Sequence, residues 1–311
     1  MNTMKKWMTA ACIVGLALIS TRCCFLKKSY CSSPFDYVSI VNRILDVCGL
    51  PEANSSEDLV EATESWMLSS EERISGDIAP VCQLKDEHAF YNDFSLLRMT
   101  QAVPSYAATY DCAVIFGGPL PALRQRLDFL IREWQRGVRF HKIIFLCGKR
   151  NCYPTIESRE HFFDSRYNPF PSENNWENET TQKVPSSEEE IAKFIWAQMA
   201  LPRAWRDSSI KVIFLLAEPS NGECASRWDT LKLFRSYQGA FSERILFVSS
   251  QPFINLDRCR LESVFNEENY DIAGPGFAQG VLKYHWASRI CLHTLAQWLQ
   301  ESSGQLKLYR E

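Results

Sequence analysis

A short apolar run closed by two glycines constrains the fold of this chain more than any other feature. The run is Cys112–Phe116, and Gly117 and Gly118 follow it directly. An apolar segment of this length between turn signals is typical of a strand buried on both faces of a parallel sheet. The glycines stand at the carboxyl end of that strand, the edge at which open α/β sheets bind their ligands.

Apolar strands and amphipathic helices continue to alternate along the chain. Leu123, Leu127 and Leu130 share one face of a helix that is predicted to begin just after the glycines. Further strands are predicted at Lys142–Cys147, Lys211–Ala217 and Arg244–Val248, with a short segment at Tyr270–Ala273 and a last helix at about Ala287–Glu301. This alternation indicates an α/β fold, a Rossmann-like parallel sheet with helices on both faces.

The composition is that of a globular protein and excludes some functions. The chain has 311 residues, 46% of them hydrophobic and 23% charged, so it can bury a large core. Its formal net charge of −3 argues against non-specific binding to nucleic acid, which needs a basic face. The 12 cysteines show no repeated spacing beyond a single Cys147/Cys152 pair, so no metal site is predicted. Pairing of cysteines in an exported protein stays open.

The first residues predict a signal peptide or a membrane anchor over residues 1–28. Lys5 and Lys6 precede an apolar run, Trp7–Ser20, that is short for a transmembrane helix. Lipidation at Cys23 or Cys24 is disfavoured by the arginine before them, and a buried N-terminal helix remains the alternative. The segment predicts that the protein is membrane-anchored or exported.

Two regions are predicted after this segment. Residues 29–109 are expected to form a helical N-terminal region that packs against the sheet, and residues 110–311 form the α/β domain. Within that domain, the polar stretch 151–185 is expected to be a lid or an insertion, and it contains a formal glycosylation sequon at Asn178. Capping boxes are predicted at the pairs Ser55/Asp58, Ser69/Glu72 and Ser186/Glu189.

Polar residues at the predicted strand ends resemble, in order, the motifs of the YdcF/SanA-like (ElyC-like) bacterial family, a domain of unknown function. The matching residues are Gly117-Gly118 with Arg124 and Arg126, then Gly148, Ser187-Glu188, Glu218 with Ser226 and Asp229, and Ser249-Ser250 with Arg258. The resemblance covers about residues 110–275. It implies a Rossmann-like ligand cleft and a role in the cell envelope, often with one N-terminal membrane segment, but no agreed reaction.

This sequence departs from the family pattern at three places. The span from Ser250 to Arg258 is two residues longer than in the family. The family's histidine after the fourth strand is replaced by Phe253 or Asn255, and Asp229 stands where the family has an amide. The histidines of the chain show no paired spacing for a metal or a catalytic triad, so a Ser-His-Asp hydrolase is not predicted. If the family acts through its histidine, this protein has lost the activity.

The predicted site lies at the carboxyl ends of the strands. Backbone and hydroxyl contacts to an anion are expected from Gly117, Gly118, Ser249 and Ser250. Charge is expected from Arg124 and Arg258, and ligand contacts from Glu188 and Asp229. Helix capping is the alternative for Glu188, and an ion pair with Arg258 is the alternative for Asp229.

Glu218 is predicted as the catalytic residue, because a carboxylate directly after an apolar strand is costly unless it is paired or used. Arg126 and Arg132 are predicted to be surface charges, and Lys149 and Arg150 to be exposed loop charges rather than phosphate contacts.

Two functions follow from this site. The first is a YdcF-like envelope protein that binds a small anionic, nucleotide- or phosphate-containing ligand, with a phosphate-linked transferase or hydrolase as the enzyme class and the cofactor unknown. The second is a non-catalytic envelope or interaction protein on the same fold. A secreted effector without a retained anchor is a third possibility.

Overall fold

A computed structural model describes residues 36–75, 77–173, 183–207, 210–222, 224–238, 244–265, 269–277 and 285–308. The predicted N-terminal segment at Trp7–Ser20 and the sequon at Asn178 lie outside the described residues. Within the described residues, no helix combines the length and the apolar character that a membrane crossing needs.

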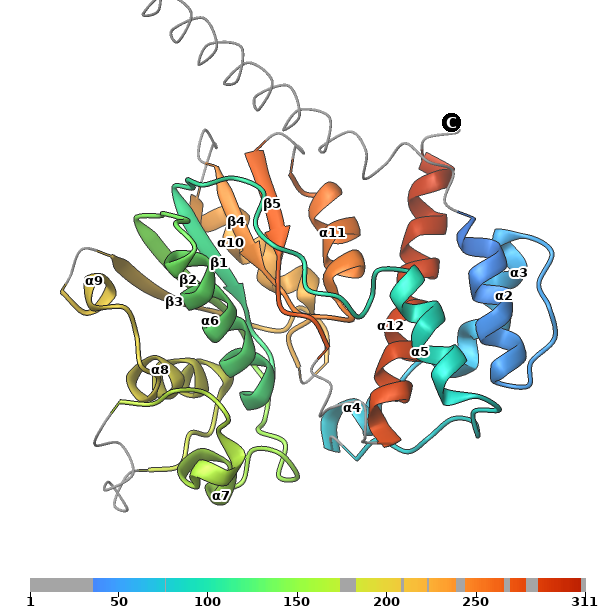
Figure 1. Ribbon diagram of the computed structural model, residues 1–311, viewed down its shortest axis with the longest axis horizontal. Coiled ribbons are helices and arrows are strands. Elements are labelled where there is room, and N and C mark those ends of the chain that lie inside the picture. Colours follow the sequence, from blue (N-terminus) through green and yellow to red (C-terminus); the bar gives the residue numbers. More distant parts are fainter. Residues whose placement is uncertain are drawn as a thin grey trace, which may run out of the picture.

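The centre of the molecule is a five-stranded sheet in which every pairing is parallel (Figure 1). Its strands are β1 (Cys112–Phe116), β2 (Lys142–Gly148), β3 (Lys211–Ala217), β4 (Ile245–Val248) and β5 (Tyr270–Ala273). The order across the sheet is β3-β2-β1-β4-β5. The chain therefore adds β2 and β3 on one side of β1 and then crosses to the other side for β4 and β5. The switch point, at which ligands bind in such sheets, lies between the carboxyl ends of β1 and β4.

Helices cover both faces of this sheet, as the sequence predicted. Side chains alternate between the two faces along each strand, so Ala113 and Ile115 enter one core and Val114 and Phe116 enter the other. The first core is completed by α6 (Leu120–Gln135), α8 (Glu188–Gln198) and the short α9 (Arg203–Arg206). The second is completed by α10 (Arg227–Gln238) and α11 (Ile254–Glu262).

A separate helical unit packs beside the sheet and is built from both ends of the described chain. It contains α2 (Tyr37–Val47), α3 (Ser56–Thr63), η1 (Glu64–Trp66), α4 (Ser70–Ser75), α5 (Glu87–Leu96) and α12 (His285–Leu308). Residues of α2, α3 and α5 share one apolar core with Cys291, Leu292, Leu295 and Leu299 of α12. The sequence predicted an N-terminal helical region but placed this last helix in the α/β domain. In the structure, α12 joins the N-terminal helices and also contacts α11.

Backbone contacts join the helical unit to the sheet. Val103 and Gly274 exchange two hydrogen bonds of 2.9 Å as an isolated antiparallel bridge. Nε2 of Gln251, just after β4, donates to the carbonyl oxygens of Arg98 and Gln101 at 2.9 and 2.7 Å. The segment that follows α5 is therefore held against the carboxyl end of β4.

The polar stretch after β2 contains regular structure. It holds α7 (Arg159–Phe163) and the 3₁₀ helix η2 (Ser165–Tyr167), and Ser172 forms an antiparallel bridge with Met199 at the end of α8.

The helix starts agree with the sequence at two of three predicted capping boxes. The amide of Asp58 donates to Oγ of Ser55, and Ser69 and Glu72 bond reciprocally. The third box was predicted one residue too early, because Ser187 caps α8 by accepting from the amide of Glu190 at 3.2 Å.

Candidate functional site

The double glycine at the end of β1 is packed against a protein carboxylate. A β-carbon on Gly117 would lie 1.8 Å from Oε1 of Glu188 and 2.8 Å from the carbonyl oxygen of Leu146. The same Oε1 atom accepts a hydrogen bond from the amide of Gly148 at 2.9 Å. The missing side chain at Gly117 thus makes room for Glu188, the first residue of α8, between the ends of β1 and β2.

Glu188 belongs to a buried ion-pair network with Arg150 and Glu157. Nε of Arg150 donates to Oε2 of Glu188 at 2.6 Å, and both Nη atoms of Arg150 donate to the carboxylate of Glu157 at 2.8 Å. The side chains of Arg150 and Glu157 are only 8% and 0% exposed. Burial disfavours the charge of Arg150, but the hydrogen bonds to Glu157 and the charge of Glu188 outweigh it and raise its pKa. The prediction that Arg150 is an exposed loop charge is therefore wrong.

The amino end of α6 is also occupied by a side chain of the protein. Oε1 of Glu157 accepts a hydrogen bond from the amide of Leu120 at 2.9 Å. The first amides of a helix favour negative charge, and here a buried carboxylate supplies it. Arg150 completes the arrangement by donating from Nη2 to the carbonyl oxygen of Gly118 at 3.0 Å.

A second group of polar residues lies at the switch point between β1 and β4. Arg126 of α6 donates from Nη1 to the carbonyl oxygens of Phe116 and Gly117 at 2.8 and 2.5 Å. Its Nε and Nη2 atoms donate to Oγ of Ser250, directly after β4, at 3.2 and 2.9 Å. Arg126 is only 2% exposed, so the prediction of a surface charge is wrong here too.

The charge of Arg126 is poorly compensated. Among the described residues no carboxylate forms an ion pair with it, and its hydrogen bonds go to neutral oxygen atoms. Its pKa is lowered to about 10, first by burial and then by the positive charge of Arg227, with Asp257 and Glu188 acting in the opposite direction. The switch point therefore carries positive charge in a site shielded from water.

Arg227 brings a second guanidinium to the same place. It lies 4.2 Å from the centre of the Phe116 ring, and its Nε donates to Oδ1 of Asp257 at 3.1 Å. Oδ2 of Asp257 accepts from the hydroxyl of Ser249 at 2.6 Å. The side chain of Arg227 is 18% exposed, so it reaches water while Asp257 and Ser249 do not.

Arg124 is placed away from this edge. Residues two apart on a helix point to nearly opposite sides, so Arg124 and Arg126 leave α6 in different directions. All five N–H groups of Arg124 are used: two go to Oε1 of Gln198 and the others to the carbonyl oxygens of His161, Phe162 and Tyr167. Burial lowers its pKa to about 10. In this arrangement Arg124 holds α7 and η2 against α6.

The remaining predicted site residues lie at the rim or in local caps. Glu218 is exposed and pairs with Lys149, whose Nζ lies 2.8 Å from its Oε2, so both residues are solvated. The carboxylate of Asp229 accepts from the hydroxyl groups of Ser220 and Ser226 at 2.6 and 2.7 Å, and from the amide of Ser226 at 2.7 Å. Burial raises the pKa of Asp229, but these bonds outweigh it and lower that pKa to about 2. Arg258 is a half-buried residue of α11.

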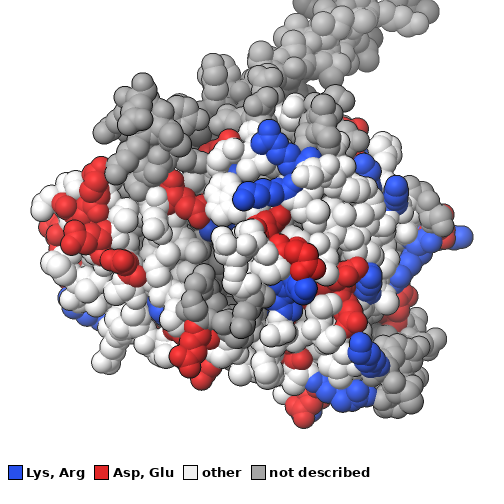
Figure 2. Space-filling view, turned by 180° about the vertical axis from the view of Figure 1, so that it is seen from behind, with Lys and Arg blue, Asp and Glu red and all other residues white. Residues whose placement is uncertain are grey.

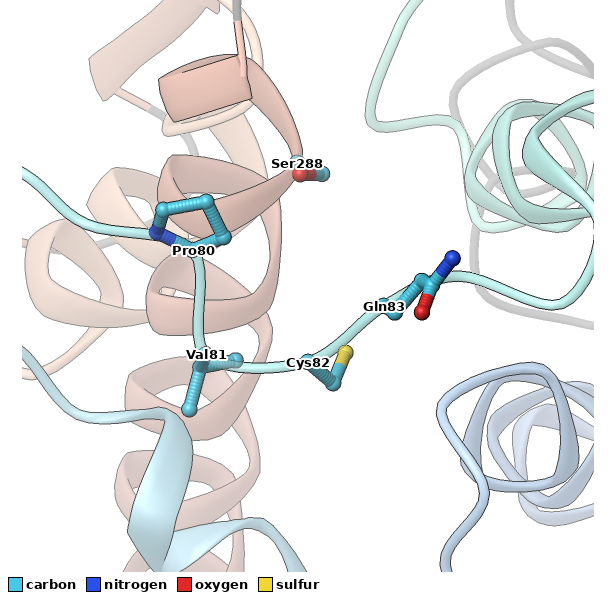
Figure 3. Close-up of a pocket in the computed structure, with 5 residues that line it drawn as sticks. All are labelled: Pro80, Val81, Cys82, Gln83 and Ser288. Carbon is cyan, nitrogen blue, oxygen red and sulfur yellow. The ribbon is translucent and has the colours of Figure 1, made fainter.

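A hollow among the described residues lies in the helical unit, away from the strand ends. It has a volume of about 560 Å³ and is lined by Pro80, Val81, Cys82, Gln83 and Ser288 of the helical unit (Figure 3). The described residues contain no cluster of His, Cys, Asp and Glu that could hold a metal ion. On the face of Figure 2, Lys and Arg are interspersed with Asp and Glu.

No family model matches the chain, and no curated protein and no solved structure matches it either.

Part of this arrangement was predicted from the sequence. Gly117, Gly118, Glu188, Ser249 and Ser250 do lie at the carboxyl ends of neighbouring strands. Sequence reasoning missed Glu157, Arg227 and Asp257. Glu157 sits in a polar stretch that contains several similar residues, and no local pattern distinguishes it.

Proposed function

We propose that the chain is a YdcF/SanA-like protein of the bacterial cell envelope, exported or anchored through its N-terminal segment. Its α/β domain would bind a small anionic ligand, nucleotide- or phosphate-containing, at the switch point between β1 and β4. A phosphate-linked transferase or hydrolase is the enzyme class that we would test first.

The buried charge of Arg126, which has no ion pair among the described residues, is the observation that carries this proposal. Burial disfavours the charge of Arg126, its four hydrogen bonds go to neutral oxygen atoms, and Arg227 adds repulsion. An anionic group at this point would relieve both effects. Arg227, which reaches water, would make the first contact with a ligand, and the hydroxyl of Ser249 shares the carboxylate of Asp257 with it.

The sheet order constrains what Glu218 could do. Glu218 follows β3, which is three strand positions from β4, so the two strand ends are about 14 Å apart at the usual spacing. A single phosphate could not touch both Glu218 and Ser250. A ligand of nucleotide size could reach from the switch point towards Glu218, which favours that class over a free anion.

A thermal-shift titration tests the ligand. Inorganic pyrophosphate, nucleotides and S-adenosylmethionine would be titrated against the full chain, the Arg227→Gln variant and the Lys149→Gln variant. A ligand at about 100 times its Kd adds roughly 2.7 kcal/mol of stability. We expect a shift for the full chain and for Lys149→Gln, and its loss in Arg227→Gln. A shift of equal size in all three proteins would contradict the site.

A second candidate is a non-catalytic envelope or interaction protein, and a specific observation favours it. The carboxylate of Glu157 already occupies the amino end of α6, and that of Glu188 occupies the space beside Gly117. A ligand phosphate would bind at these two places in a Rossmann-like fold. Absence of a thermal shift with every ligand of the panel would support this candidate.

Glu218→Ala separates the catalytic and non-catalytic candidates once a ligand or partner is known. Because Glu218 is solvated, the substitution leaves the fold intact. An enzyme that uses this carboxylate would lose turnover sharply, whereas an interaction protein would bind its partner unchanged. Fractionation of a bacterial host that expresses the full chain tests the envelope location. Recovery of the protein from the cytosolic fraction alone would contradict it.

A further inference from the structure

Two cysteines of the helical unit lie against each other. Cys48 caps the carboxyl end of α2 and is buried in the core of the unit, at 8% exposure. Cys82 belongs to the extended segment 77–86 and packs against the same core. Cys82 lies close enough to Cys48 to contribute to the raised pKa of the Cys48 thiol.

The backbone holds the segment that carries Cys82 along the end of α2. The amide of Lys85 donates to the carbonyl oxygen of Val47 at 3.0 Å, next to Cys48 in the chain. Nζ of Lys85 also lies 2.9 Å from Oδ1 of Asp46. These two contacts keep the thiols near each other without a covalent link.

Cys82 is the more exposed of the two cysteines. Cys82 is half-buried and lines the hollow of about 560 Å³ with Pro80, Val81, Gln83 and Ser288. In Figure 3 the segment passes α12 at Pro80, next to Ser288, and Cys82 and Gln83 lie further along it. A small oxidant in the hollow would therefore meet Cys82, while Cys48 lies behind it in the core.

We propose that Cys48 and Cys82 form a disulfide that ties α2 to segment 77–86. The oxidant would be a disulfide, either glutathione disulfide or the active-site disulfide of a thiol oxidoreductase. This inference does not depend on the ligand site at the strand ends.

The disulfide would form by thiol–disulfide exchange in two displacement steps. The thiolate of Cys82 attacks one sulfur of the oxidant, the oxidant's S–S bond breaks, and one thiolate leaves. The Cys48 thiol then loses its proton and attacks Sγ of Cys82, and the second thiolate leaves. The cysteine pair is oxidised, the oxidant is reduced to two thiols, and these thiols take up the two protons.

Burial determines which sulfur reacts first. Burial raises the pKa of Cys48, and its bond to Cys82 and the nearby charge of that thiol add to the effect. Cys48 is therefore a poor nucleophile towards an oxidant in solution and acts as the resolving thiol. Two of the other described cysteines have different neighbours: Sγ of Cys152 faces the carbonyl oxygen of Pro185, and Sγ of Cys259 faces the hydroxyl of Ser302.

Peptide mapping tests the link directly. Trypsin cleaves after Arg43, Arg73 and Lys85, so Cys48 falls in peptide 44–73 and Cys82 in peptide 74–85, each with no other cysteine. The folded full chain would be incubated with glutathione disulfide, free thiols would be alkylated, and the digest would be analysed by mass spectrometry without reduction. We expect peptides 44–73 and 74–85 to be joined in the full chain and in Cys152→Ser, and not in Cys82→Ser.

Two results would overturn the proposal. One is alkylation of both cysteines in the folded, oxidised chain. The other is a link from peptide 74–85 to any other cysteine, or a link to peptide 44–73 that forms only in denaturant.

A thermal measurement gives a second readout. Oxidation should raise Tm by about 5 to 10 °C, because the bridge closes a long loop in the unfolded chain. The rise should persist in Cys152→Ser and disappear in Cys82→Ser. An equal rise in Cys82→Ser would contradict the assignment.

Discussion

The carboxylate of Glu188 occupies the place that a side chain at Gly117 would need, with 1.8 Å between Oε1 and an added β-carbon. The glycine that marks the end of β1 in the sequence is thus required by a residue 71 positions later in the chain. It admits a part of the protein itself, which then binds the amide of Gly148 and the guanidinium of Arg150.

Gly117→Ala should therefore destabilise the protein strongly. The new methyl group meets Glu188 and the carbonyl oxygen of Leu146, and the backbone atom cannot move away at low cost. We expect a loss of at least about 2 kcal/mol in the free energy of unfolding, measured by urea denaturation. Gly118→Ala is the matched control, because the nearest atom to its methyl group would be the end of the Arg126 side chain, at 3.0 Å, and it should cost less. Equal losses would contradict the packing at Gly117.

Adjacent residues Arg150 and Lys149 should differ sharply in their contribution to stability. Arg150→Met leaves the buried carboxylates of Glu157 and Glu188 without their cation, which costs about 3 to 5 kcal/mol. Lys149→Met removes an exposed pair with Glu218, where each side chain is more than half exposed, and should cost about 1 kcal/mol or less. Urea denaturation of the two variants at neutral pH checks this order. A smaller loss for Arg150→Met than for Lys149→Met would contradict the buried ion pairs of Arg150.

Arg124→Met should release the segment that contains α7 and η2. The substitution removes five hydrogen bonds to Gln198 and to three backbone carbonyl groups, so we expect faster amide exchange in residues 159–168 and a loss of about 2 kcal/mol or more. Hydrogen exchange with mass spectrometry measures it, with Arg132→Met on the exposed side of α6 as the control. Unchanged exchange together with a lost ligand shift would instead support the anion contact that the sequence predicted.

Asp229 should make the stability depend on pH in the acid range. Its pKa is about 2 in the folded protein, below the ordinary value of 3.8, so the unfolded chain binds the proton more readily. Its contribution is fully present above about pH 4 and is lost as the pH falls towards 2. The advantage of the native chain over Asp229→Asn, measured by urea denaturation, should shrink over that interval. A constant difference from pH 6 to pH 2 would contradict this prediction.

The strands were predictable from sequence, because each is an apolar run bounded by turn residues. The predicted bounds of β1, β3 and β5 agree with the structure, and those of β2 and β4 differ by one residue. The side of the sheet on which β4 lies was not predicted, and that side creates the switch point at which Arg126 meets Ser250.

The buried charges were not predictable in the same way. Arg126 and Arg150 were predicted to be surface charges, because arginine is rarely fully buried unless it is paired. Their burial depends on partners that the fold brings from elsewhere: Ser250 for Arg126, and Glu157 and Glu188 for Arg150. Hydrophobic periodicity can be recognised within a short stretch of sequence. Ion pairs and hydrogen bonds between distant segments cannot, because both partners must be known.

The position of α12 has a consequence for synthesis of the chain on the ribosome. The helices α2, α3 and α5 are translated before the sheet, whereas α12, whose apolar face covers them, is translated after it. At about 5 to 20 residues per second, their core stays open for on the order of ten seconds or longer while the sheet is translated. The α/β sheet can fold during this interval, whereas α2, α3 and α5 expose apolar side chains until α12 has been translated. Exposed apolar surface of this kind favours aggregation of a nascent chain until α12 has been translated.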